Sequence, residues 1–142
     1  MAKAQQLVDE SGTKGTTVSV ITTTDQTSKN IGLYFVSLLN DLGYKAKIKL
    51  LTASVEYSFA QNSSQNPQMT LSWWYPDYSD PADWFNIMIG CAGFHPNSNA
   101  SPNLSEFCDP KIQKMTEAAL KTEINDPEGS LAQWTAIDKA TT

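Results

Sequence analysis

The sequence predicts an α/β fold in which a mainly parallel sheet is flanked by helices, giving three layers. The first observation is that three short segments rich in β-branched and other apolar residues punctuate the first part of the chain. The second is that helical periodicity separates these segments, and a crossover helix between two strands makes them parallel neighbours. The third is the length of 142 residues, which suits one domain with a real core.

The first part of the chain holds the predicted strands and their crossover helices. Residues 16–22 alternate β-branched side chains, which is typical of a strand. Between Asn30 and Leu42 the apolar residues follow helical spacing, and Gly43 supplies the left-handed conformation that ends a helix. The remaining elements predicted here are a short helix ending at Gly12, a strand at 46–51, a weaker helix at 52–62 and a third strand at 69–74.

The rest of the chain is predicted to be helical, and one dipeptide marks where its helices begin. Aspartate followed by proline occurs three times, at residues 80–81, 109–110 and 126–127. Each pair places a carboxylate at the N-cap and a proline at the first helical position. A long polar loop bounded by Cys91 and Cys108 separates the first two of these helices, and such a loop in a compact domain is usually functional or disordered.

Charge and hydropathy exclude several classes of protein. The net charge of −5 argues against a nucleic-acid partner, because binding to a phosphate backbone requires a basic face. The lysines of KAKIK fall at alternate positions, which is typical of the solvent-facing side of a strand. No apolar run approaches the roughly 18 residues that cross a membrane, and the polar, helical start shows no signal peptide.

The motifs of common enzymes and metal sites are absent from the sequence. It has no GxSxG elbow, no phosphate-binding glycine loop and no HExxH pair. Two cysteines and the single histidine, His95, do not make a four-ligand zinc site, and acids three residues apart do not match a calcium loop. We therefore predict no enzyme activity, no cofactor and no metal. A glycan-active enzyme is the less favoured alternative, because aromatic platforms suit a sugar.

The stretch WWYPDYSDPAD, at the end of the third predicted strand, is the candidate site. Ligands of open parallel sheets collect outside the carboxyl ends of the strands. Asp80 is explained as a helix cap, and Asp83 as a first-turn acid that complements the helix dipole. Asp77 has neither role and lies between Tyr75 and Tyr78, where a carboxylate can meet a cation that donates hydrogen bonds. The alternative is an ordinary loop acid.

Cys91 and Cys108 lie 17 residues apart, a spacing that suits a disulfide closing the polar loop. Such a bond implies an oxidising compartment. With no signal peptide visible, that location requires either a processed start or a chain that is a piece of something longer. Two unrelated buried thiols are the alternative.

Several motifs follow one another in an order that identifies a family. They are Trp74-x-x-Asp77-x-x-Asp80-Pro81, an apolar helix, Cys91, a loop of Gly, Asn and Ser, and Cys108-Asp109-Pro110-x-Ile112. This order resembles the family 5 extracellular solute-binding proteins, the dipeptide- and oligopeptide-binding components of ABC importers. The segments LLNDLGYKAKIKLL and GSLAQWTAIDKA are also similar to that family, so the resemblance covers nearly the whole chain.

The resemblance implies that residues 1–142 form a single α/β ligand-binding lobe, the carboxy-proximal one, of a larger bilobed periplasmic-binding-protein fold. It implies two hinged lobes that close on a peptide, and an ABC transporter permease in the membrane that receives the closed form. The implied location is extracytoplasmic, in the periplasm or as a cell-surface lipoprotein, and the implied state is a monomer. The alternatives are a non-peptide solute, such as a sugar, a metal complex or an opine, and a small stand-alone α/β interaction domain.

The resemblance also assigns roles to individual residues. Asp77 matches the aspartate that takes the α-ammonium group of a bound peptide. Cys91 and Cys108 match a disulfide of the dipeptide-binding members. The ligand-binding residues that the resemblance implies are Asp77, Asn103 and Ser105. Trp74, Tyr75 and Tyr78 are predicted to join them because aromatic rings beside a carboxylate attract an ammonium group and accept apolar side chains.

Overall fold

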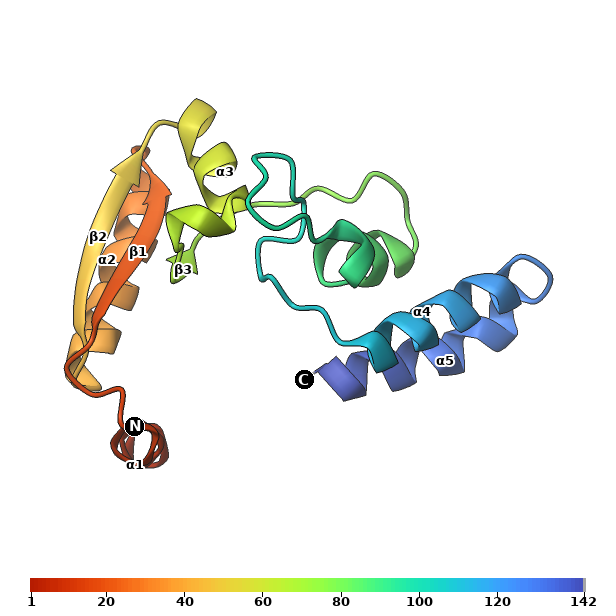
Figure 1. Ribbon diagram of the computed structural model, residues 1–142, viewed down its shortest axis with the longest axis horizontal. Coiled ribbons are helices and arrows are strands. Elements are labelled where there is room, and N and C mark those ends of the chain that lie inside the picture. The colour runs from red at the N-terminus through yellow and green to blue at the C-terminus, as the bar shows by residue number, and fades with distance from the viewer. Residues whose placement is uncertain (142) are drawn as a thin grey trace. The chain divides into compact units, whose positions relative to one another are not determined.

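A computed structural model describes residues 1–141 of the chain (Figure 1). These residues divide into two compact units. The first unit holds residues 1–60 and 65–73, and the second holds residues 61–64 and the chain from residue 74 onward. Within the described residues, no helix combines the length and the apolar character needed to cross a membrane.

The first unit contains a three-stranded parallel sheet. Its strands are β1 (Thr17–Thr23), β2 (Lys45–Leu51) and β3 (Met69–Thr70), in the order β2-β1-β3. Val20, at the centre of the sheet, pairs with Ile48 of β2 and with Met69 of β3. The predicted parallel α/β class is confirmed, with all three strands parallel and β1 in the middle.

The third strand is shorter than its predicted span of 69–74. Its ladder contains two residue pairs, and the Leu71 N–H adds one further hydrogen bond of 3.0 Å to the Ile21 carbonyl. After Leu71 the chain leaves the ladder: Trp73 has 67% of its surface exposed, and the indole N–H of the half-buried Trp74 donates to Asp83.

Three helices belong to the chain segments of the first unit: α1 (Ala2–Ser11), α2 (Gln26–Asp41) and α3 (Ala53–Gln61). α2 begins before the predicted Asn30 because the Asp25 side chain caps it, accepting a hydrogen bond from the Ser28 N–H at 3.0 Å. This bond and the Thr23 hydroxyl lower the pKa of Asp25 to about 2. The apolar spacing that predicted the helix does not mark this polar first turn.

α2 packs closely against β1 and β2 (Figure 1). The approach occurs at Gly32, where an added Cβ would lie 3.0 Å from side-chain atoms of Ile48 and Thr22. A glycine inside this helix is therefore explained by the sheet beneath it. On β2, Ala46 is buried while the lysines at 45, 47 and 49 are exposed, as the alternation predicted.

The second unit is mainly helical. Its long elements, α4 (Pro110–Glu123) and α5 (Pro127–Thr141), lie side by side as a hairpin (Figure 1). Asp109 caps α4 by accepting from the Lys111 N–H at 2.7 Å, and Asp126 Oδ1 accepts from the Gly129 N–H at 2.9 Å at the start of α5. Two of the three predicted aspartate–proline helix starts are thus confirmed as regular α-helices.

The helix predicted after Pro81 has a different form. It is a short π-helix, η2 (Asp83–Met88), followed by a 3₁₀ turn, η3 (Cys91–Gly93). Asp80 Oδ1 accepts from the Ala82 N–H at 2.7 Å, but the N-cap position of η2 is Ala82, so the prediction that Asp80 caps the helix is wrong. The wider π turn begins at Asp83 and not at the proline, and Asp83 is buried there.

The core of the second unit anchors the start of η2. Its buried members are Ala82, Ile112, Ala119, Trp134 and Ile137. Phe85 stacks on the Trp134 ring with centroids 5.9 Å apart. Because Ala82 and Phe85 flank Asp83, the hydrophobic core fixes the end of the turn that carries the candidate site.

Candidate functional site

The candidate site lies on residues 74–83, hereafter the acidic turn. The Asp80 N–H donates to the Tyr78 carbonyl at 3.0 Å, and the Asp83 N–H donates to the Asp80 carbonyl at 3.2 Å. Between Trp74 and Tyr78 the backbone has no regular secondary structure. The turn is therefore organised by its side chains as much as by its backbone.

Asp83 is the residue that organises the acidic turn. Its side chain is fully buried, with 0% of its surface exposed. Its Oδ2 accepts from the Trp74 indole N–H at 2.9 Å and from the Asp77 backbone N–H at 3.3 Å. Its Oδ1 is buried and has no hydrogen-bond partner among residues 1–141. Asp83 does lie in the first turn of η2, as predicted, but its burial and the two hydrogen bonds that it accepts give it a further role that the sequence did not indicate.

Three of the predicted ligand residues are presented on the surface of the turn. Asp77 is exposed, Tyr75 has 85% of its surface exposed and Tyr78 is about half exposed. Trp74 is half-buried, because its indole nitrogen is turned toward Asp83. The turn thus brings Asp77, Tyr75, Tyr78 and Trp74 into one short segment, with the carboxylate of Asp77 facing solvent.

The acidic turn holds a local excess of negative charge. Partial removal from water raises the pKa of the Tyr78 phenol, and the charges of Asp83, Asp80 and Asp77 raise it further. The neighbouring Asp80 side chain, with which a protonated Glu123 carboxyl on α4 can share its proton, raises the pKa of Glu123. Such a cluster attracts a cation and repels an anion.

An open hollow of about 300 Å³ lies beside the turn, within the second unit. It is lined by Tyr78, Asp80, Ala82, Leu120, Glu123 and Ile124. Its polar lining residues, Tyr78, Asp80 and Glu123, come from the acidic turn and the end of α4, and its other lining residues are aliphatic.

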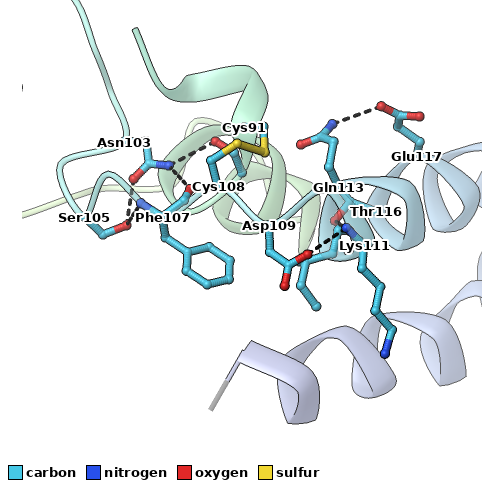
Figure 2. The surroundings of a disulfide bond; sticks show 12 residues. Cys91, Asn103, Ser105, Phe107, Cys108, Asp109, Lys111, Gln113, Thr116 and Glu117 are labelled. Carbon is cyan, nitrogen blue, oxygen red and sulfur yellow. Dashed lines mark hydrogen bonds between the residues drawn. A yellow bond between two sulfur atoms is a disulfide. The ribbon is translucent and has the colours of Figure 1, made fainter. Parts of the chain in front are cut away.

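Cys91 and Cys108 form the predicted disulfide, with their Cα atoms 4.5 Å apart (Figure 2). The bond closes the loop of residues 91–108, hereafter the disulfide loop. Gly93 is buried inside it, and a Cβ at this position would collide with the Ile87 carbonyl oxygen. The loop is therefore folded tightly back onto the preceding π-helix.

Asn103 and Ser105 are engaged inside the disulfide loop (Figure 2). Asn103 is 1% exposed, and its amide donates to the carbonyls of Gly90 at 3.0 Å and Phe107 at 2.8 Å. The Ser105 hydroxyl donates to Asn103 Oδ1 at 2.7 Å and accepts from the Phe107 N–H at 3.2 Å. Both amide hydrogens of Asn103 are thus taken by the protein, whereas Ser105 lies at the surface.

The structure therefore separates the predicted site residues into two groups. Asp77, Trp74, Tyr75 and Tyr78 lie together on the acidic turn, while Asn103 and Ser105 support the disulfide loop. Contact of any of them with a ligand stays a prediction. The residue that sequence reasoning missed is Asp83, because the only signal for its role is an indole nine positions earlier in the chain.

Comparison with known proteins places the chain in a family. Residues 1–96 match the family described as bacterial extracellular solute-binding proteins, family 5 middle region. A probable ABC transporter periplasmic-binding protein, SapA, of Escherichia coli K12 is 31% identical over 78 residues, which cover 54% of this chain and 14% of that protein. The peptide transport periplasmic protein SapA of Salmonella typhimurium LT2 is 28% identical over 78 residues, again covering 54% and 14%.

Solved structures share the fold. The periplasmic binding protein DppA of Helicobacter pylori, in complex with the peptide STSA, matches with a TM-score of 0.85 and 16% identity over 98% of this chain and 26% of that one. A dipeptide-binding protein of Pseudoalteromonas sp. SM9913, in complex with Met-Leu, matches with a TM-score of 0.80 and 18% identity, over 96% of this chain and 26% of that one. The Escherichia coli murein tripeptide binding protein MppA matches with a TM-score of 0.78 and 20% identity, over 98% of this chain and 26% of that one. This chain therefore spans about a quarter of each of these structures.

Proposed function

The chain belongs to the bacterial extracellular solute-binding proteins of family 5, and from this premise we propose that it is part of the peptide-binding component of an ABC importer. Its place is extracytoplasmic, in line with its family and its periplasmic relatives. The proposal of peptides as solutes is supported by relatives and fold neighbours whose names refer to peptide transport or peptide binding.

The chain is proposed to form one lobe of a larger protein. It covers 14% of the curated relatives that it matches and about a quarter of the solved structures. In this proposal a second lobe, joined by a hinge, closes over the acidic turn and removes the bound solute from water. A permease in the membrane then receives the closed, monomeric binding protein. The chain's own role is binding, without catalysis.

Asp77 is the proposed anchor for the α-ammonium group of the peptide. The observation that carries this assignment is an exposed carboxylate on a turn that holds three aspartates and no basic residue. An ammonium group donates charge-assisted hydrogen bonds to a carboxylate, and these strengthen as water is excluded. Tyr75 and Tyr78, on either side, add a cation–π attraction of roughly 0.5–2 kcal/mol when a ring face meets the ammonium.

The other predicted residues have supporting roles in this proposal. Trp74 offers an apolar wall for the first side chain of the peptide, since its indole N–H is already bonded to Asp83. Asn103 shapes the disulfide loop, and the surface hydroxyl of Ser105 is the part of that loop available to a ligand. Aromatic and aliphatic walls accept varied side chains, while a few polar groups set the orientation of the bound molecule.

The test compares Asp77→Asn with Asp41→Asn in the full-length protein that carries this chain. Asp41, an exposed residue at the end of α2, provides the same chemical change far along the sequence from the turn. Peptide that co-purifies with the unaltered protein is identified by mass spectrometry and then titrated by calorimetry. Removing one partner of a desolvated charge pair typically costs about 2–5 kcal/mol, or roughly 30- to several-thousand-fold in affinity.

The expected result is a loss of this size for Asp77→Asn and wild-type affinity for Asp41→Asn. Equal affinity of the two variants would show that Asp77 is an ordinary loop acid. A co-purified solute without an amino group would favour the alternative, a binder of the same fold with a non-peptide solute.

A further inference from the structure

Asp83 is buried more completely than its place at a helix start requires. Its side chain has no exposed surface, whereas an acid in the first turn of a helix ordinarily stays in water. Burying a carboxylate is unfavourable unless hydrogen bonds compensate for the lost hydration. The two donors that compensate Asp83 both come from the acidic turn, and one of them belongs to Asp77.

The bonds of Asp83 close the turn into a ring. The Trp74 indole N–H and the Asp77 backbone N–H meet at the same oxygen, Oδ2, at 2.9 Å and 3.3 Å. In the opposite direction, the Asp83 N–H donates to the Asp80 carbonyl at 3.2 Å. The backbone of Asp77 is thereby held from the buried side, so its Cα–Cβ bond has a fixed direction and its carboxylate remains exposed.

We propose that Asp83 is the positioning residue of the ammonium site: it holds the backbone of Asp77 and the indole of Trp74 so that the Asp77 carboxylate is pre-organised for a peptide amino group. This inference rests on the proposed function. Pre-organisation raises affinity because less conformational freedom is lost on binding. Without Asp83, the irregular backbone between Trp74 and Tyr78 loses the acceptor that both donors share.

The unpaired oxygen of Asp83 provides a way to separate hydrogen bonding from charge. Because Oδ1 has no partner among residues 1–141, an asparagine can place its oxygen at the Oδ2 position and its NH₂ group where Oδ1 lies. Asp83→Asn therefore retains the acceptor for Trp74 and Asp77. Asp83→Ala removes that acceptor. Asp83→Leu also removes it, but fills the buried position with an apolar side chain.

The experiment uses the full-length protein and two probes, a random tripeptide library and the same library with acetylated amino termini. Retained peptides are quantified by mass spectrometry, and the measured quantity is the preference, defined as free-amine peptide retained divided by acetylated peptide retained. The preference, unlike the total amount bound, does not change when a variant is merely less stable. Asp109→Ala is the matched structural control, since it removes an aspartate cap from α4 within the same unit.

The expected result is a preference that falls about tenfold or more in Asp77→Asn and Asp83→Ala, and by less than about threefold in Asp83→Asn. Asp109→Ala should lower the melting temperature while keeping the wild-type preference. Asp83→Leu takes the place of Asp83→Ala if circular dichroism shows that the alanine variant is unfolded.

The outcomes separate the two proposals. If Asp77→Asn loses the preference but Asp83→Ala and Asp83→Leu retain it, Asp83 is not a positioning residue and the proposed function stands. If Asp77→Asn retains the preference, or if the unaltered protein retains neither library, the proposed ammonium site fails and the inference fails with it. An equal loss in Asp83→Asn and Asp83→Ala would assign the effect to charge and overturn positioning by hydrogen bonds.

Discussion

The acidic turn and the disulfide loop are both polar segments of the second unit, but they use their polar groups in opposite ways. The turn carries Asp77, Asp80 and Asp83 without a basic residue. The loop carries amides and hydroxyls, with Glu106 as its single acid. In the turn, the Asp77 carboxylate remains exposed, whereas in the loop the side chain of Asn103 is buried among backbone carbonyls.

This difference teaches that polar composition alone does not identify a binding group. A buried amide whose hydrogens already reach protein carbonyls stabilises the loop and has little left to offer a ligand. An exposed carboxylate among other carboxylates, in contrast, is available to a ligand, and a bound cation stabilises its charged form. Changes in the loop should therefore alter stability, and changes in the turn should alter binding and its dependence on charge.

The largest expected effect on stability comes from removing the disulfide. Replacing both Cys91 and Cys108 with serine should lower the free energy of unfolding by roughly 3 kcal/mol, the loop-entropy value for a closed segment of about this length. Chemical denaturation monitored by tryptophan fluorescence measures the change. The folded fraction should keep the wild-type preference for free-amine peptides. A lost preference in a fully folded variant would show that the loop also takes part in binding.

A smaller loss of stability is expected for Asn103→Ala. The substitution leaves the carbonyls of Gly90 and Phe107 without their donor, which should cost roughly 2 kcal/mol for two hydrogen bonds. Asn99→Ala is the matched control, because Asn99 is exposed and its bond to Asn62 lies at the surface. Thermal unfolding of the two variants should differ clearly. Equal melting temperatures would mean that the buried amide network does not support the loop.

The smallest expected effect is a change in how stability depends on pH. The Asp80 carboxyl raises the pKa of Glu123, so the folded chain holds this proton more tightly than the unfolded chain. The resulting stability is fully present at acidic pH and is lost as pH rises through the folded pKa of Glu123. Glu123→Gln removes this dependence, so its free energy of unfolding should change less than that of the unaltered protein between about pH 4 and pH 7.

Urea denaturation at several pH values measures this effect. Glu117→Gln, on the exposed face of the same helix, is the control. If Glu117→Gln flattens the pH profile as much as Glu123→Gln does, the contact with Asp80 is not its source.

Most of the fold could be predicted because its signals are local. β-branched alternation located β1, and its observed bounds, Thr17–Thr23, differ by one residue from the predicted 16–22. The aspartate–proline pairs located α4 and α5, since capping acts within one helical turn. The prediction was least accurate for β3, where apolar residues continue after the ladder ends, and for the π-helix, whose wider turn has no distinct sequence pattern.

The candidate site could be predicted only in part, for a physical reason. Asp77 was identified by elimination, because no local role explained it. Asp83 was assigned a local role that fits its position, and its burial depends on Trp74 and on the core around Ala82, which are contacts of tertiary structure. Sequence reasoning also did not show that Asn103 is satisfied internally, since an amide in a polar loop looks the same whether it faces inward or outward.

The position of β2 at one side of the sheet has a consequence for self-association. Among the described strands, β2 pairs only with β1, and at its other edge the Asn40 side chain accepts from the Ala46 N–H at 2.8 Å. The edge of a sheet is where sheets of different molecules can join. If the β2 strand of a second copy paired with this edge in register, each of the lysines at 45, 47 and 49 would lie beside the same lysine of the other copy, at the distance between neighbouring strands. Like charges directly opposite each other disfavour such pairing. The alternating lysines on the solvent-facing side of β2 thus also disfavour the addition of a strand from a second molecule at this edge.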